Sequence, residues 1–311
     1  MVRFVPDDID FNFVRYGKHA LVSSIVLVIC SIITMVFHGL EVGTDFTGGI
    51  VIDFSIHGEN IDDGSVKSAL LNAGLSGMSV QSFKGNNTKG EYMLTFRGDT
   101  GPDKHHSVDR VKAALNTLGE VTYNKLDYVG AQVGVEQIKE AVIAVCCALL
   151  CMFAYLCIRF RWQFAMGGVL ALLHDIIITM GMISVTGLEF SLPAMAGILM
   201  IIGYSVNDSV VIYDRVRELM KSDIHKGVPF VVNAGINTTL SRTLLTSGTT
   251  LIAALPLIIL CDGAVRNIGI IVFCGIVVGT YSSIFISTVP FVKSLEKELT
   301  KEREQHTQAN G

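Results

Sequence analysis

Three charged side chains stand out inside long apolar runs of the sequence. Asp175 occurs in "LLHDIIITMG", Asp208 in "IIGYSVNDSVV" and Arg242 in "TLSRTLLTSGTT". A charged side chain at the centre of a bilayer costs at least a few kcal/mol, so each of these residues is a functional candidate. Burial favours a neutral carboxyl group, whereas a nearby guanidinium, which stays charged, favours the carboxylate. A carboxyl group whose distance from an arginine changes could therefore take up and release a proton.

These runs belong to six predicted membrane helices. Half of the residues are apolar and only 17% are charged, which is too hydrophobic for a soluble chain of 311 residues. A hydrocarbon core of about 30 Å requires about 20 residues per helix. The predicted spans are 20–38, 137–158, 164–187, 192–213, 241–261 and 267–290.

The distribution of basic residues predicts the orientation of the helices. Lysine and arginine gather in the short connections on one side, at Arg159, Arg161, Arg215, Arg217, Lys221, Lys226, Lys293, Lys297, Lys301 and Arg303. Because such residues are enriched on the cytoplasmic side, we expect the N-terminal segment 1–19 and the tail 291–311 to be cytoplasmic. We expect 214–240 to be a cytoplasmic loop that carries an amphipathic helix.

Residues 41–135 have the pattern of an external, folded α+β domain. Strand-like alternation in "GIVIDFSI" is followed by a helical pattern, two strands, a second helix and a last strand. The order βαββαβ is that of ferredoxin-like domains. This segment contains no catalytic triad, nucleotide-binding loop or Cys/His metal spacing, so we expect a binding domain rather than an enzyme. The cysteines, most of them in the apolar spans, are expected to be buried packing residues.

The helical rise of 1.5 Å per residue places the polar residues by depth. Asp175, Asp208 and Thr246 lie roughly 20 to 24 Å from the outer helix ends, and Arg242 roughly 30 Å. If helices 192–213 and 241–261 are neighbours, the long arginine side chain could reach this level. The alternatives are that Arg242 extends to the cytoplasmic surface, that Asp208 pairs locally, and that His174 and Asp175 form a structural polar pair.

Four motifs resemble those of a known family. They are "VGTDFTGG" at 42–49, "GYSVNDSVVIYDRVRE" at 203–218, "NTTLSRTLLTSGTTL" at 237–251 and "GIVVGTYSSIFISTVP" at 275–290. Their sequences and order resemble the SecD/SecF family of the RND superfamily, and in particular its SecF members. The same six-helix topology is implied over about 42–292. Two residues depart from the usual pattern, since Ala131 replaces a frequent proline and Gly235 replaces a bulkier residue.

The resemblance implies an accessory subunit of the Sec protein-export machinery in the bacterial cell inner membrane. The implied partners are SecD, the SecYEG channel, YajC, the emerging preprotein and membrane lipid, without nucleic acid. The implied energy source is the proton-motive force, with protons as the coupling ion and no cofactor or metal. By resemblance, Asp208 and Arg242 occupy the positions of the proton-relay aspartate and arginine. Candidate supporting residues are Asp175, His174, Asn207 and Thr246.

The same resemblance marks a motif at the membrane surface. Its residues are Gly43, Asp45, Phe46, Gly48 and Gly49. Glycines permit backbone angles closed to other residues and allow another chain to approach closely, while Asp45 could bind local amides. The alternative is an ordinary tight entry into the first strand. Farther along the chain, Gly275 and Gly279 form a G-x-x-x-G pair suited to close helix contact.

Two other functions fit parts of this pattern. One is half of an RND-type proton-coupled exporter of small molecules, although the chain has only one set of six helices and a small external domain. The other is a passive assembly scaffold in which the buried polar residues hold helices together. Both remain alternatives at the level of the sequence.

Overall fold

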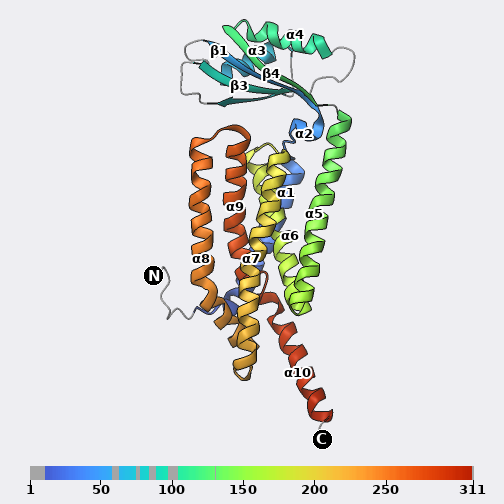
Figure 1. Cartoon of the computed structure of the whole chain (residues 1–311), viewed down its shortest axis with the longest axis vertical. Helices are drawn as coiled ribbons and strands as arrows, with labels where there is room; N and C mark the ends of the chain where they lie inside the picture. The colour runs from blue at the N-terminus through green and yellow to red at the C-terminus, as the bar shows by residue number, and fades with distance from the viewer. Residues whose placement is uncertain are drawn as a thin grey trace.

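The computed structural model describes residues 11–57, 63–74, 78–83, 89–96, 104–129 and 131–309. A bundle of long helices carries a small α/β domain at one end, and α10 (Val292–Ala309) extends from the opposite end (Figure 1). The predicted fold class, six membrane helices with one βαββαβ domain, is confirmed.

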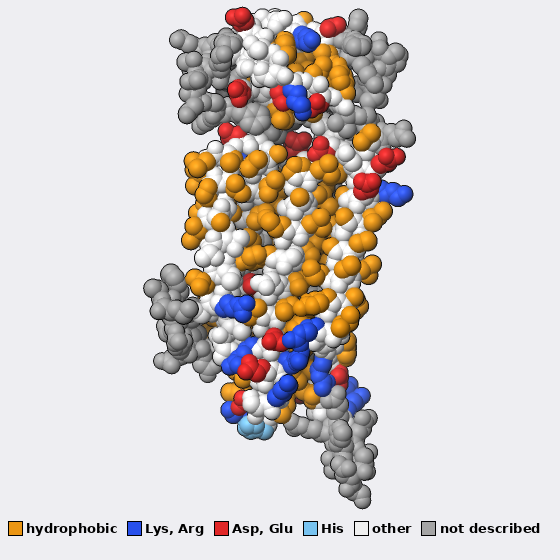
Figure 2. Space-filling view, in the orientation of Figure 1, with side chains coloured by type: hydrophobic (Ala, Val, Ile, Leu, Met, Phe, Trp, Pro, Cys, Tyr) orange, Lys and Arg blue, Asp and Glu red, His pale blue; other side chains and the backbone are white. Residues whose placement is uncertain are grey.

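Six helices of the described chain are long and apolar enough to cross a membrane. They are α1 (Phe13–His38), α5 (Ala131–Arg159), α6 (Trp162–Thr186), α7 (Leu192–Ser222), α8 (Val228–Leu260) and α9 (Gly263–Phe285). Helices α6, α7 and α9 bury about half of their most apolar stretch, whereas α1 and α5 bury little of theirs. Hydrophobic side chains cover much of the face of the bundle that Figure 2 shows, and exposed large hydrophobic residues occur on all six helices. That surface is open to lipid or to another membrane protein.

The cysteines differ from the prediction of buried packing residues. All seven are free thiols, and five of them are exposed on the surfaces of α1 and α5, at Cys30, Cys146, Cys147, Cys151 and Cys157. The reason is that these two helices lie at the periphery of the bundle, so a lipid-compatible side chain need not be buried in protein.

The cytoplasmic loop expected at 214–240 is much shorter in the structure. Helix α7 continues to Ser222, a short 3₁₀ turn covers Ile224–Lys226, and α8 begins at Val228. Charged residues end the hydropathy signal after 213, but the apolar positions of both helices continue with helical spacing. They pack in one buried cluster that includes Tyr213, Val216, Val228, Val231, Val232 and Ile236.

The last membrane helix begins and ends earlier than the predicted span 267–290. Helix α9 ends at Phe285, and the chain turns before a 3₁₀ helix at Val289–Phe291. Pro290 has no backbone N–H and cannot continue the helical hydrogen-bond ladder. The break therefore comes just before the proline.

The external domain is a four-stranded antiparallel sheet with two helices on one face. Its strands are β1 (Gly49–His57), β2 (Met78–Phe83), β3 (Lys89–Phe96) and β4 (Glu120–Val129), in the order β2-β3-β1-β4. Helices α3 (Asp63–Asn72) and α4 (Lys104–Leu115) cover the face that points away from the bundle (Figure 1). Alternate residues of β1, from Ile50 to Ile56, are buried against them.

Glycines set the closest helix contacts in the bundle. A Cβ atom on Gly275 would lie 2.1 Å from Ile201 Cδ1, and one on Gly279 would lie 3.3 Å from Ser205 Cβ, so the G-x-x-x-G pair brings α9 against α7. At Gly235, a Cβ atom would lie 2.5 Å from Val216 Cγ2, which explains how this glycine lets α8 approach α7. The helices that carry the candidate residues are therefore packed at short range.

Gly181 makes a contact that a side-chain rotation cannot relieve. A Cβ atom there would lie 2.7 Å from the Cα atom of Ser31 on α1. We expect Gly181→Ala to lower the stability of the chain by about 1–3 kcal/mol, as overpacking does in well-packed cores. The measurement is thermal unfolding in detergent micelles. The matched control is Gly203→Ala, because a Cβ atom on Gly203 meets nothing within 4 Å in the described structure. Equal melting temperatures for the two variants would contradict the tight α1–α6 contact.

Candidate functional site

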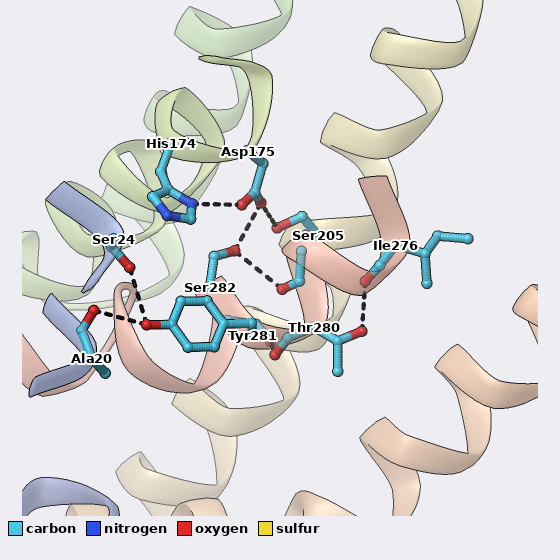
Figure 3. Close-up of polar contacts among 11 residues, drawn as sticks. Ala20, Ser24, His174, Asp175, Ser205, Ile276, Thr280, Tyr281 and Ser282 are labelled. Atoms are coloured by element: carbon cyan, nitrogen blue, oxygen red, sulfur yellow. Dashed lines mark hydrogen bonds and ion pairs between the residues drawn. The ribbon is translucent and has the colours of Figure 1, made fainter. Parts of the chain in front are cut away.

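Asp175 lies at the centre of a buried hydrogen-bond network (Figure 3). Its side chain is 1% exposed. The Oδ2 atom accepts a hydrogen bond from Ser205 Oγ of α7 at 2.6 Å and another from Ser282 Oγ of α9 at 2.8 Å. The Oδ1 atom lies 3.0 Å from Nδ1 of His174. Both carboxyl oxygens are thus hydrogen-bonded, and they tie α6 to α7 and α9.

His174 extends this network toward α1. Its ring centroid lies 6.3 Å from that of Tyr281, whose hydroxyl donates to the carbonyl oxygen of Ala20 at 2.7 Å and accepts from Ser24 Oγ at 3.1 Å (Figure 3). Within the described part of the chain, His174 Nε2 is buried and has no hydrogen-bond partner. The contact of Nδ1 with Oδ1 of Asp175 lets the histidine ring orient the Asp175 side chain.

Asp208 has a different environment, although it lies on the same helix as Ser205, three residues farther along. Its side chain is 2% exposed, and among the described residues its Oδ2 atom has no hydrogen-bond partner. The polar groups that interact with this carboxyl come from α8, and they are Ser247, Arg242 and Thr246. A buried carboxyl group with a bare oxygen atom can accept a proton without losing a hydrogen bond.

The hydroxyl groups beside Asp208 are linked to α9 and to the α8 backbone. Ser247 Oγ lies 2.7 Å from Thr280 Oγ1, and Thr246 Oγ1 donates to the carbonyl oxygen of Thr243 at 3.0 Å. These bonds occupy the hydroxyl groups only in part, since a serine or threonine hydroxyl also has lone pairs that can accept. The Asp208 carboxyl is therefore bordered by polar groups rather than tightly clamped by them.

Arg242 and Asn207 lie on the outer surface of the bundle. Helices α7 and α8 are neighbours, as the proximity of Asp208 and Arg242 requires, but in the described structure the two side chains form no ion pair. Arg242 is exposed, and so is Asn207. The structure thus brings Asp175 together with His174, and Asp208 with Thr246, while Asn207 points away from both groups.

The surface motif forms a joint between the external domain and α7. Residues Thr44–Thr47 form the short helix α2. The Oδ2 atom of Asp45 accepts a hydrogen bond from the backbone N of Leu192 at 3.0 Å. The expected bond to local amides is therefore replaced by one to the first residue of α7. Phe46 is buried and stacks on Phe190 with ring centroids 5.4 Å apart.

The glycines of this motif are approached closely by segments of the same chain. Gly48 and Gly49 have φ angles of 69° and 156°. A Cβ atom on Gly49 would lie 2.7 Å from the carbonyl oxygen of Phe96, and one on Gly43 would lie 2.7 Å from Oε1 of Glu189. A larger side chain at Gly49 would push against the backbone of β3, whereas one at Gly43 would displace the side chain of Glu189.

Several residues of the site were not among the sequence-based candidates. Ser205 and Ser282 hold Asp175, Ser247 borders Asp208 and is hydrogen-bonded to Thr280, and Tyr281 links α9 to α1. The available signal was the density of hydroxyl residues in "GTYSSIFIST" and "TSGTT". Among the described residues, no group of three His, Cys, Asp or Glu side chains could hold a metal ion.

The two buried aspartates should differ in their effect on stability. Asp175→Ala removes the acceptor of the Ser205 hydroxyl and one of the two acceptors of the Ser282 hydroxyl, which keeps the carbonyl oxygen of Gly279, so we expect a fall in melting temperature of about 5 °C or more. Asp208→Asn removes a charge from a carboxyl with a bare oxygen, and we expect a change of less than about 2 °C. Thermal unfolding of both purified variants in one detergent compares them. A larger loss for Asp208→Asn would contradict the assigned environments.

The chain resembles known protein-export components. Residues 110–298 match the family described as "Protein export membrane protein SecD/SecF, C-terminal". "Protein translocase subunit SecF" of Rickettsia rickettsii is 37% identical over 302 residues, which are 96% of this chain and 97% of that protein. The same subunit of Rickettsia typhi is 39% identical over 289 residues, which are 92% of each chain.

Solved structures of SecDF are similar as well. The crystal structure of SecDF, a translocon-associated membrane protein from Thermus thermophilus, has a TM-score of 0.80 and 31% identity, and the match covers 94% of this chain. A SecDF structure in a super-membrane-facing form has a TM-score of 0.72 and 30% identity over 98% of this chain. The chain spans about two fifths of those polypeptides, 40% and 41%. With six membrane helices, one βαββαβ domain and a family match over most of its length, the chain belongs to the SecD/SecF family of protein export membrane proteins.

Proposed function

We propose that the protein is an accessory subunit of the Sec export machinery that uses the proton-motive force together with a SecD partner. Its relatives bear the name of a protein translocase subunit, and its match spans about two fifths of the solved SecDF chains. The exposed apolar surface of the bundle offers a face for such a partner. SecYEG, YajC and the emerging preprotein are the further partners of this function, with lipid around the helices.

The observation that supports a proton relay is the bare Oδ2 atom of the buried Asp208. When this carboxyl is ionised, it attracts the guanidinium of Arg242; when it takes up a proton, that attraction is lost. Because α7 and α8 meet closely at Gly235, a change in attraction at Asp208 favours a different spacing of the two helices. A membrane potential contributes about 2.3 kcal/mol per charge per 100 mV, which is enough to bias two states more than tenfold.

The two aspartates argue against a purely structural role for the buried polar residues. Asp175 has the full set of hydrogen bonds expected of a group that holds helices together. Asp208 does not, although its burial costs as much. A scaffold would gain nothing from this second carboxyl. The exporter alternative lacks support from the relatives, which are protein translocase subunits.

The relay residues can be tested through export. In cells whose only copy carries Asp208→Asn or Arg242→Met, we expect export of a secreted reporter to slow by about tenfold, since proton passage no longer biases the two states. Pulse-chase labelling measures the rate, and immunoblotting of membranes measures abundance. Asp214→Asn is the matched control, because Asp214 lies on the same helix but is exposed and paired with Arg159. Normal export in the Asp208→Asn strain would refute the relay.

The orientation is proposed from the charge distribution. Lysine and arginine gather at the end of the bundle opposite the sheet domain (Figure 2), which favours a cytoplasmic location for that end and a periplasmic location for residues 41–135. The proposed location is therefore the bacterial cell inner membrane, with both termini inside.

Cysteine labelling in intact spheroplasts tests this orientation. In a variant whose native cysteines are replaced by alanine, Leu71→Cys lies on α3 and Lys301→Cys on α10, both at exposed positions. We expect a membrane-impermeant maleimide to label only Leu71→Cys until the membrane is permeabilised, because only the external domain faces the reagent. Labelling of Lys301→Cys in sealed cells would reverse the orientation.

A further inference from the structure

Helix α7 is capped by a residue of the short helix α2, which lies where the chain enters the external domain. Ser191 occupies its N-cap, and within the described structure that side chain makes no capping hydrogen bond. The N–H of Leu192, the first helical residue, donates instead to Oδ2 of Asp45, which is 147 residues earlier. The first N–H groups of a helix lack intrahelical partners, and a carboxylate there also interacts favourably with the helix dipole. Asp45 therefore holds the end of α7.

Backbone pairing strengthens this attachment. The N–H of Phe190 donates to the carbonyl oxygen of Glu41 at 2.7 Å, and the N–H of Gly43 donates to the carbonyl oxygen of Phe190 at 2.9 Å. Val42 and Phe190 form a parallel β-bridge. The stacked rings of Phe46 and Phe190 lie beside this bridge. The segment 41–46 and the start of α7 thus form one fixed joint.

The other side of this joint is continuous with the sheet and with α5. Gly49 is the first residue of β1 and lies against the carbonyl of Phe96 on β3. A Cβ atom on Gly134 of α5 would lie 2.4 Å from the carbonyl oxygen of Phe46. These contacts pack α2 closely against both the sheet and α5. A shift of the α7 N-terminus must therefore displace the sheet.

The same helix carries Asp208. Asp208 lies 16 residues after Leu192, a separation of about 24 Å at the helical rise. The proline of α7 lies in its first turn, so none interrupts this stretch. A helix without an internal proline transmits an axial shift along its length rather than absorbing it at a kink.

We propose that Asp45 is a positioning residue that couples α7 to the external domain, so that a shift of α7 at Asp208 moves the domain. This inference rests on the proposed function, because it takes proton uptake at Asp208 as the event that displaces α7. It assigns Asp45 to transmission of the movement and not to the passage of protons. Its loss should therefore separate proton flux from domain movement.

The experiment measures both quantities on one sample. The full chain, in complex with its SecD partner, is reconstituted in liposomes, and proton flux is followed with an internal pH dye. Spin labels at Leu71 on α3 and Leu260 at the end of α8, introduced into a cysteine-free variant, report the distance between the domain and the bundle with and without a proton gradient. Both positions are exposed, at 52% and 79%.

Two variants break the same hydrogen bond from opposite sides. Asp45→Ala removes the acceptor, and Leu192→Pro removes the donor at the first helical position, where proline is well tolerated. Asp45→Asn keeps an amide oxygen that can accept from the Leu192 N–H. Glu41→Gln is the matched control, because it removes a carboxylate from the same segment while the Glu41 backbone carbonyl keeps its bond to Phe190.

We expect Asp45→Ala and Leu192→Pro to keep proton flux within about twofold of the wild type and to lose the distance change that the gradient produces. Asp45→Asn and Glu41→Gln should keep both. A gradient-dependent distance change of wild-type size in Asp45→Ala and Leu192→Pro would overturn the coupling. The coupling would also be overturned if the distance in the wild-type complex did not change with the gradient. In that case the flux assay would still test the proton relay independently. Flux that is unaffected by Asp208→Asn would instead overturn the proposed function.

Discussion

The hydrogen bonds from Ser205 and Ser282 to the carboxylate of Asp175 fix the arrangement of the central helices. A buried carboxylate in a medium without water must find its donors within the protein, or its burial is prohibitive. The two donors come from α7 and α9, so both helices must approach α6 at the same level. The small residues Gly275 and Gly279 make this possible, because α9 reaches α7 only where no side chain intervenes. Packing and polar satisfaction thus require the same geometry.

That geometry gives the two buried aspartates separate tasks. Asp175 has hydrogen-bond partners on its own helix and on two others, so a movement of its side chain would break hydrogen bonds. Asp208 lies three residues after Ser205 on α7. The neighbouring hydroxyl groups belong to α8, and within the described chain the Oδ2 atom of Asp208 has no hydrogen-bond partner. A protonation change at Asp208 can therefore alter the α7–α8 contact while the Asp175 network preserves the α6–α7–α9 core. The exposed Arg242 has room to follow that change, because no ion pair within the described chain holds it.

The sequence predicted the parts whose signals are local. The six membrane helices and the βαββαβ order were recognisable because apolar residues recur in each segment with the length or spacing of its secondary structure. Asp208 was recognisable as a polar residue in an apolar run. The extension of α7 to Ser222 was missed because hydropathy falls at Asp214 and Arg215, although Tyr213 and Val216 continue the buried face. The hydrogen bonds of Asp175 and Asp45 were missed because their donors lie far along the chain, where no local pattern identifies them.

Helix α7 contacts the surface motif at one end, the buried polar residues in its middle and α8 at its other end. Its first residue is bound by Asp45 of the surface motif, its middle holds both Ser205 and Asp208, and its last turns pack with α8 in the buried cluster that includes Tyr213 and Val216. A chain that only needed to anchor the external domain could end this helix at the membrane surface and leave the domain on a free linker. The capped N-terminus, the β-bridge at Val42 and the crowded glycines remove that freedom. The domain is thus attached to a helix that carries Asp208 and contributes Ser205 to the Asp175 network, and this attachment gives a change at Asp208 a mechanical route out of the membrane.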